Sequence, residues 1–147
     1  MARLKEHLKD EENFMLTYGD GLSDVNIAEL VEFHKQHKKL VTVTAVHPVA
    51  RFGEMIIEDN VVKNFKEKPQ IDQGWINGGF FVVNKKFLNY IKGDHTILEK
   101  EPLESVCNDN ELMSFKHEGF WQCMDTLRDK KSLEKLWNEE KAPWKTW

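Results

Sequence analysis

The amino-acid sequence predicts an α/β fold: a mixed, mostly parallel sheet with a β-hairpin insertion and flanking helices. The first observation is an apolar run that ends in Gly19-Asp20-Gly21, as a buried strand ends in a tight turn. The second is a β-branched run at 40–46 after an amphipathic helical pattern, so that strand, helix and strand form a unit with a right-handed crossover. The third is a pair of apolar segments around Glu58-Asp59-Asn60, which predicts a hairpin with a three-residue turn.

Length and composition are those of one domain that covers residues 1–147. With 25 Asp and Glu against 21 Lys and Arg, the chain lacks the basic excess of a nucleic-acid-binding protein. No stretch approaches the roughly 20 apolar residues of a membrane span, and the charged first residues do not form a signal peptide. Cys107 and Cys123 lack a metal-binding spacing and are expected to be core thiols, although counting alone permits one disulfide. The low cysteine count suits a reducing compartment, and we expect a soluble, cytoplasmic protein. We therefore expect neither a nucleic acid nor a membrane as partner.

The first half of the chain gives three further expectations in order. Residues 2–10 are expected to form a short helix, because two leucines lie on one stripe. The first strand is expected at about 14–18. Asp24 is the expected N-cap of a helix that ends near Lys38, and the strand at 40–46 follows it.

Beyond the hairpin, glycines and caps guide the assignment. Residues 75–83 read as a strand interrupted by Asn77-Gly78-Gly79, where glycines mark a bulge or a close approach of a ligand. Short helices are expected from about 85 and at 102–106, and a last strand at 112–116. Thr126-Leu-Arg-Asp129 predicts a capping box that opens the final helix.

Two aspartates follow strands and are candidate metal ligands. Asp20 lies in the Gly-Asp-Gly turn, and ligands in open α/β sheets bind beyond the carboxyl ends of the strands. Asp125 precedes the last helix, where it could equally complement the helix N-terminus. If the two carboxylates converge, they suit Mg²⁺, which takes oxygen ligands and shares itself with substrate phosphates. The alternative for Asp20 is ordinary turn chemistry.

Other motifs have competing interpretations. Glu67-Lys68-Pro69 is either a solvated charged turn or a segment in which proline holds Lys68 extended toward a phosphate. His34 and His37 share a helix face, but without a third recognisable ligand the pattern disfavours zinc. The tryptophans near the end of the chain are expected to anchor the tail on the domain or on a neighbouring subunit.

In combination, these segments resemble the sugar nucleotidyltransferases, and among them the bacterial glucose-1-phosphate cytidylyltransferases. The combined spacing is far more specific than any single motif and spans nearly the whole chain. The residues that carry the resemblance are Thr17-Tyr-Gly-Asp-Gly21, Arg51-Phe-Gly53, Phe65-Lys-Glu-Lys-Pro69, Trp75-Ile-Asn-Gly-Gly-Phe-Phe81, Glu101-Pro-Leu-Glu104, Gly119-Phe-Trp-Gln122, Met124-Asp-Thr-Leu-Arg-Asp-Lys130 and Ala142-Pro-Trp-Lys145. The resemblance implies part of a Rossmann-like nucleotidyltransferase domain.

The resemblance also implies a reaction and a set of catalytic residues. In the family, a sugar phosphate oxygen attacks the α-phosphate of CTP and pyrophosphate leaves. Asp20 and Asp125 are implied to hold Mg²⁺ between nucleotide and sugar phosphate, and Lys68 to contact the phosphate of glucose 1-phosphate. The protein contributes alignment and charge neutralisation.

The sugar pocket is implied in the same way. Glu67 is implied to bind the sugar hydroxyls, while Gly53 and Asn77-Gly78-Gly79 line the pocket through close backbone approach. The expected ligand is therefore glucose 1-phosphate or CDP-glucose, with Mg²⁺ as the cofactor.

One part of the family pattern is missing from these 147 residues. Members carry a glycine-rich loop with an Arg and a following Lys that cradle the triphosphate, and neither G-x-G-x-x-G nor G-x-x-x-x-G-K-[ST] occurs here. We therefore expect the carboxyl-terminal, sugar- and metal-binding part of the domain, inactive alone. The strand at 14–18 is expected to leave an exposed edge, which favours a homo-oligomer. The alternatives are a non-catalytic sugar-phosphate-binding or assembly module, and a subunit completed by a separate chain.

Overall fold

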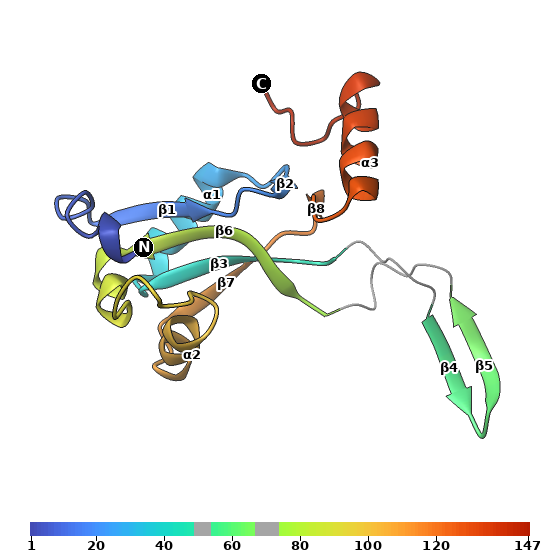
Figure 1. Ribbon diagram of the computed structural model, residues 1–147, viewed down its shortest axis with the longest axis horizontal. Coiled ribbons are helices and arrows are strands. Elements are labelled where there is room, and N and C mark those ends of the chain that lie inside the picture. Colours follow the sequence, from blue (N-terminus) through green and yellow to red (C-terminus); the bar gives the residue numbers. More distant parts are fainter. Residues whose placement is uncertain (49–53, 67–73) are drawn as a thin grey trace.

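A four-stranded mixed sheet forms the centre of the molecule (Figure 1). The computed structural model describes residues 1–48, 54–66 and 74–147. The strand order is β1 (Asn13–Thr17), β6 (Ile76–Asn84), β3 (Val41–Val46) and β7 (Leu112–Lys116). Strands β3 and β7 are parallel, whereas β6 runs antiparallel to both β1 and β3. The mixed sheet is thus confirmed. Strands β1 and β3 run in the same direction, as the strand–helix–strand unit predicts, but β6 lies between them. Most neighbouring pairs are therefore antiparallel and not parallel as expected.

Helical segments cover both faces of this sheet. The 3-10 helix η2 (Lys85–Tyr90) and α2 (Glu101–Asn108) pack on one face, where Val41, Phe81 and Val106 belong to one buried apolar cluster. Helix α1 (Ile27–His37) packs on the other face, toward which the alternate residue Thr42 points. This double coverage explains why β3 is apolar or β-branched along its whole length.

Two predicted helix boundaries are wrong, for local reasons. The helix expected at 2–10 is only a 3-10 turn, η1 (Ala2–Leu4), followed by further turns. Helix α1 is capped by Asn26, whose Oδ1 accepts hydrogen bonds from the backbone N–H groups of Ala28 and Glu29. Asp24 is not the cap, because its carboxylate contacts His117 instead.

The hairpin insertion consists of β4 (Glu54–Glu58) and β5 (Val61–Lys66). Its turn contains two residues rather than the expected three, and Asp59 and Asn60 both have left-handed φ angles of 47° and 67°. Such turns match the twist of antiparallel strands, and Asp and Asn tolerate them. Six apolar side chains of the hairpin are 50–59% exposed: Met55, Ile56, Ile57, Val61, Val62 and Phe65.

A short two-stranded ribbon was not predicted. Strands β2 (Gly21–Ser23) and β8 (Trp121–Cys123) pair antiparallel, and α3 (Leu127–Asn138) follows β8. The predicted capping box of α3 is confirmed, with reciprocal hydrogen bonds between Thr126 and Asp129.

Two smaller expectations have different outcomes. Cys107 is exposed rather than in the core, because α2 turns that side toward solvent. The Trp144 ring packs on Phe120, with ring centroids 5.4 Å apart, so this tryptophan anchors the tail on its own domain as expected. No helix in the described part of the chain is long and apolar enough to cross a bilayer.

Candidate functional site

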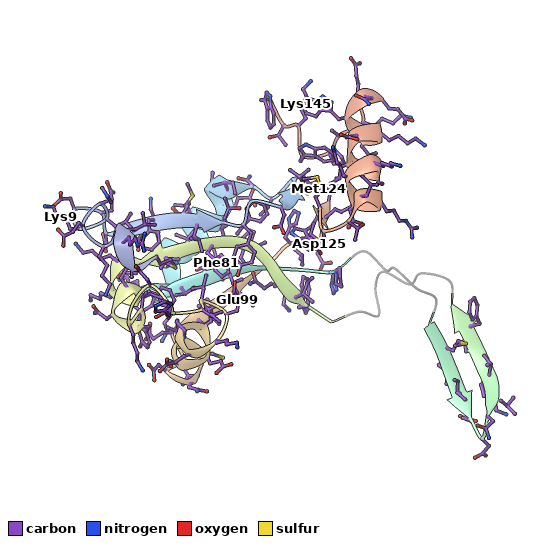
Figure 2. All side chains as sticks on the ribbon, viewed as in Figure 1. Lys9, Phe81, Glu99, Met124, Asp125 and Lys145 are labelled. Atoms are coloured by element: carbon purple, nitrogen blue, oxygen red, sulfur yellow. The ribbon has the colours of Figure 1, made fainter. Side chains whose placement is uncertain are left out.

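The ribbon formed by β2 and β8 brings the chain segments of Asp20 and Asp125 together. The Met124 N–H donates to the Asp20 carbonyl oxygen at 2.8 Å, and Gly21 is opposite Cys123. Asp20 directly precedes β2 and Asp125 follows Met124, so both lie at the same end of the ribbon. Figure 2 shows Met124 and Asp125 near the start of α3. Both residues are exposed.

Asp20 and Asp125 place two carboxylates at this end of the ribbon. Within residues 1–48, 54–66 and 74–147, no group of three or more His, Cys, Asp or Glu is arranged to hold a metal. Mg²⁺ is commonly bound by one or two carboxylates plus substrate phosphates, so Asp20 and Asp125 are residues that could hold it. One Asp125 oxygen, Oδ2, accepts a hydrogen bond from the Cys123 thiol at 3.2 Å.

The predicted bulge at Asn77-Gly78-Gly79 is present, as a register shift between β3 and β6. A Cβ at Gly78 would lie 2.8 Å from Val46 Cγ1, and the Gly78 carbonyl accepts from Trp121 Nε1 at 2.8 Å. Gly79 has φ of 80° and lies against the Tyr18 ring, which a Cβ would approach to 3.0 Å. Gly78 therefore lets β6 pass close to β3, and Gly79 lets it approach Tyr18 beside the Gly-Asp-Gly turn.

A polar cluster beside these glycines went unrecognised in the sequence. The Tyr18 hydroxyl donates to a Glu99 carboxylate oxygen and accepts from Asn77 Nδ2 at 3.2 Å. Asn77 Oδ1 in turn accepts from the Gly79 N–H at 2.8 Å. Burial, with the Glu99 hydrogen bond acting in the same direction, raises the pKa of the Tyr18 phenol to about 12. Because Glu99 is 81 residues from Tyr18, no local pattern could have paired them.

Three predicted site residues lie outside the described residues. They are Gly53, Glu67 and Lys68. Their roles in phosphate and sugar binding therefore stay predictions.

The two helix histidines form a hydrogen-bond network. His34 Nδ1 and His37 Nε2 lie 2.8 and 2.7 Å from the Thr42 hydroxyl oxygen. His37 Nδ1 accepts from the Lys39 N–H, and His34 Nε2 lies 3.2 Å from Asn13 Oδ1. The neutral tautomers that satisfy these contacts have His37 donating to Thr42, Thr42 to His34, and His34 to Asn13. Burial, and secondarily the neighbouring His37, lower the pKa of His34 to about 4.

Comparison with known proteins assigns the chain to a family. The nucleotidyl transferase family model matches residues 1–130, so the chain belongs to that family. It is 50% identical over 147 residues to the glucose-1-phosphate cytidylyltransferase of Salmonella typhi, covering all of this chain and 57% of that protein. A mannose-1-phosphate guanyltransferase of Aspergillus oryzae is 32% identical over 127 residues, covering 82% of this chain and 35% of that protein.

Solved structures show the same fold. HddC from Yersinia pseudotuberculosis, in a complex with GMP-PN, superposes with a TM-score of 0.61 at 19% identity, covering 92% of this chain and 61% of that one. The chain spans little more than half the length of the Salmonella typhi cytidylyltransferase.

Proposed function

We propose that these 147 residues supply the sugar-phosphate- and metal-binding part of a glucose-1-phosphate cytidylyltransferase. The observation that carries the proposal is the meeting of the Asp20 and Asp125 segments at one end of the ribbon. The 50% identity to a cytidylyltransferase over the full 147 residues supports this substrate class over other sugar phosphates.

Each predicted residue has one role in this proposal. Asp20 and Asp125 hold Mg²⁺, which neutralises phosphate charge when bound. Lys68 binds the phosphate of glucose 1-phosphate as a point charge, and Glu67 binds sugar hydroxyls. The backbone at Gly53 and at Asn77-Gly78-Gly79 completes the sugar pocket; that segment of β6 already lies against the Tyr18 turn.

We further propose that this chain alone does not form CDP-glucose. The 147 residues contain no glycine-rich loop whose backbone donors could neutralise a triphosphate. Loss of a single preorganised donor costs roughly a hundredfold or more in rate, and here the whole set is lacking. Pyrophosphate release from CTP and glucose 1-phosphate by the purified chain would contradict this.

Assembly into a homo-oligomer is the companion proposal, supported by β1. The Tyr18 N–H donates to the Gly79 carbonyl, and the Lys85 N–H donates to the Glu12 carbonyl. The backbone N–H and C=O groups of the even-numbered residues of β1 therefore point toward β6. Alternate residues such as Met15, which is 60% exposed, then turn their backbone groups to the open edge of the sheet. An exposed apolar edge is a template for pairing with another chain. Sedimentation at high concentration should find species larger than a monomer.

The direct test of function is calorimetric binding of glucose 1-phosphate with and without Mg²⁺. Asp20→Asn and Asp125→Asn should each weaken Mg²⁺-dependent binding, and the two effects should be non-additive because both act on one ion. Lys68→Ala should cost on the order of 1.5–3 kcal/mol, the value of a charge-assisted contact. Asp10→Asn, an exposed aspartate in the first turns, is the matched control. Absence of binding at millimolar ligand would refute the proposal, and strictly additive aspartate effects would show that the two carboxylates do not share an ion.

A further inference from the structure

The ribbon that carries the two aspartates is too short to hold itself in place. Each strand has three residues, and even longer isolated two-stranded pairs are marginal in water. One end carries Asp20 and the Met124–Asp125 segment, and the other end is tied to the sheet by side chains. At that tied end, the Ser23 hydroxyl donates to the Phe120 carbonyl at 2.8 Å. This bond joins the two strands, and at the other end the Tyr18 N–H, which donates to the Gly79 carbonyl, holds the chain to β6 just before Asp20.

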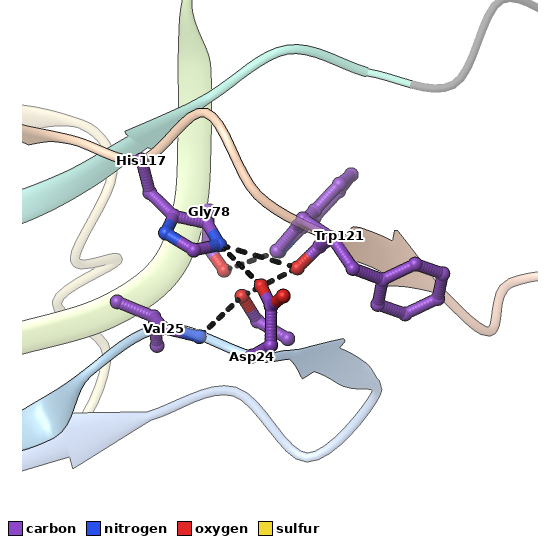
Figure 3. Close-up of polar contacts among 7 residues, drawn as sticks. Asp24, Val25, Gly78, His117 and Trp121 are labelled. Carbon is purple, nitrogen blue, oxygen red and sulfur yellow. Dashed lines mark hydrogen bonds and ion pairs between the residues drawn. The ribbon is translucent and has the colours of Figure 1, made fainter. Parts of the chain in front are cut away.

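A second contact at this end joins Asp24 and His117 (Figure 3). Asp24 directly follows β2, and its Oδ1 lies 2.8 Å from His117 Nε2. The same nitrogen lies 3.3 Å from the Phe120 carbonyl oxygen, so both neighbours are acceptors and Nε2 carries the proton. The His117 side chain is 13% exposed and that of Asp24 is 32% exposed, so water competes only weakly for this hydrogen bond.

His117 is itself fixed to the sheet. It directly follows β7, and its backbone N–H donates to the Ala45 carbonyl of β3 at 2.9 Å. Trp121, in the ribbon, donates from Nε1 to the Gly78 carbonyl of β6 at 2.8 Å. The His117 imidazole therefore holds Asp24, the first residue after β2, at a fixed place relative to β7 and β3.

A glycine makes this contact possible. A Cβ at Gly119 would lie 2.5 Å from Asp24 Oδ1 and 2.7 Å from His117 Cε1. Real Cβ atoms essentially never show such distances, so another residue at 119 would displace the Asp24 carboxylate or the His117 ring. Gly119 thus offers a way to break the pair without altering either of its chemical groups.

We propose that Asp24 and His117 are positioning residues, which hold the β2–β8 ribbon so that Asp20 and Asp125 can share one divalent ion. This role rests on the proposed function for its ligand, but it also makes a ligand-free claim about the ribbon. Neither residue touches the ion. Asp24 follows β2 and His117 precedes β8, so their hydrogen bond holds the two strands of the ribbon together at the end opposite the carboxylates.

The ligand-free test is amide hydrogen exchange measured by NMR. The Met124 N–H, which bonds the Asp20 carbonyl, should exchange at least roughly tenfold faster in Gly119→Ala and in Asp24→Ala. The Asn84 amide, bonded to the Leu40 carbonyl inside the sheet, should be unchanged. Gly93→Ala is the matched control, because a Cβ there meets nothing within 4 Å. Unchanged exchange at Met124 in both variants would overturn the proposal.

The ligand test uses glucose 1-phosphate with and without Mg²⁺. Gly119→Ala and Asp24→Ala should weaken Mg²⁺-dependent binding roughly ten- to a hundredfold, the cost of misplacing a site by about 1 Å. Asp24→Asn, which keeps an acceptor for His117 Nε2, should restore binding to within about threefold of wild type. Asparagine as damaging as alanine would overturn the hydrogen-bond role.

The two tests separate this proposal from the proposed function. If the wild-type chain binds no glucose 1-phosphate, the proposed function fails, and the Met124 exchange still decides whether Asp24 and His117 hold the ribbon. If wild type binds and the variants bind equally well, the positioning role fails and the function stands. Should Gly119→Ala not fold, as a thermal melt would show, the comparison of Asp24→Ala with Asp24→Asn carries both tests.

Discussion

The central sheet and the β2–β8 ribbon are held by different forces. In the sheet, β3 and β6 contribute fully buried side chains such as Val41, Phe81 and Val83, and helical segments cover both faces. In the ribbon, every residue of β2 and β8 is only partly buried, and a few polar contacts hold the two strands to each other and to the sheet. Burial of apolar area stabilises the first region, and geometry of a few hydrogen bonds positions the second.

This difference indicates which substitutions would damage the candidate site and which would lower the stability of the fold. Segments with little buried apolar surface open locally at a lower free energy than the core. Asp20 and Asp125 belong to such a segment, so substitutions near them can damage the site without unfolding the domain. Substitutions in the sheet should act the other way, through global stability.

The largest expected effect tests the sheet. Phe81 is 2% exposed, and Phe81→Ala should destabilise the domain by about 3–5 kcal/mol, because it removes buried surface and leaves a cavity. Urea unfolding measures it, with Met15→Ala, at a 60% exposed position of β1, as the control. A loss below about 1 kcal/mol for Phe81→Ala would contradict the view that burial holds this region.

The second effect is pH dependence from the buried histidine. The pKa of His34 is lowered to about 4 from 6.5, so between these values the unfolded chain binds a proton that the folded chain does not. Stability should therefore fall as the pH drops from about 6.5 to 4, by at most about 3 kcal/mol, and His37, whose pKa is also lowered by burial, adds in the same direction.

Urea unfolding at pH 7 and pH 4.5 measures this loss. In His34→Gln the loss should shrink, whereas in His95→Gln, at an exposed loop position, it should match wild type. Equal losses in the two variants would mean that other groups cause the acid sensitivity.

The same division explains what the sequence could predict. The sheet strands carry periodic or continuous apolar patterns, and the last strand was predicted with the bounds that it has, Leu112–Lys116. The three-residue strands of the ribbon are too short to carry any pattern. Asp24 and Asn26 are both good N-caps in sequence, and only the distant His117 decides between them.

The candidate site divides in a similar way. The strand-end rule and the capping box are local signals, and they predicted two carboxylates near one another. The structure brings the two backbone segments together, and the role of Asp20 and Asp125 as metal ligands stays a prediction. The Tyr18–Glu99 hydrogen bond depends on tertiary packing between distant segments, as does the close approach of Asp24 and His117 to Gly119. No spacing in the sequence encodes these contacts.

The smallest expected effect lies at the junction of the two regions. Thr126 Oγ1 accepts from the Asp129 N–H at 3.2 Å and caps α3, directly after Asp125. Thr126→Ala should therefore cost about 1 kcal/mol of stability, a typical value for a lost N-cap. Because the cap also fixes where Asp125 leaves the ribbon, Mg²⁺-dependent binding of glucose 1-phosphate should weaken in this variant.

Thr126→Ser, which keeps the hydroxyl, is the control for both effects. Thermal unfolding and calorimetry on the two variants measure stability and binding separately. If Thr126→Ala lost stability but bound as tightly as Thr126→Ser, the start of α3 would not position Asp125. The position of that carboxylate would then depend on contacts other than the cap of α3, such as the hydrogen bond from the Cys123 thiol.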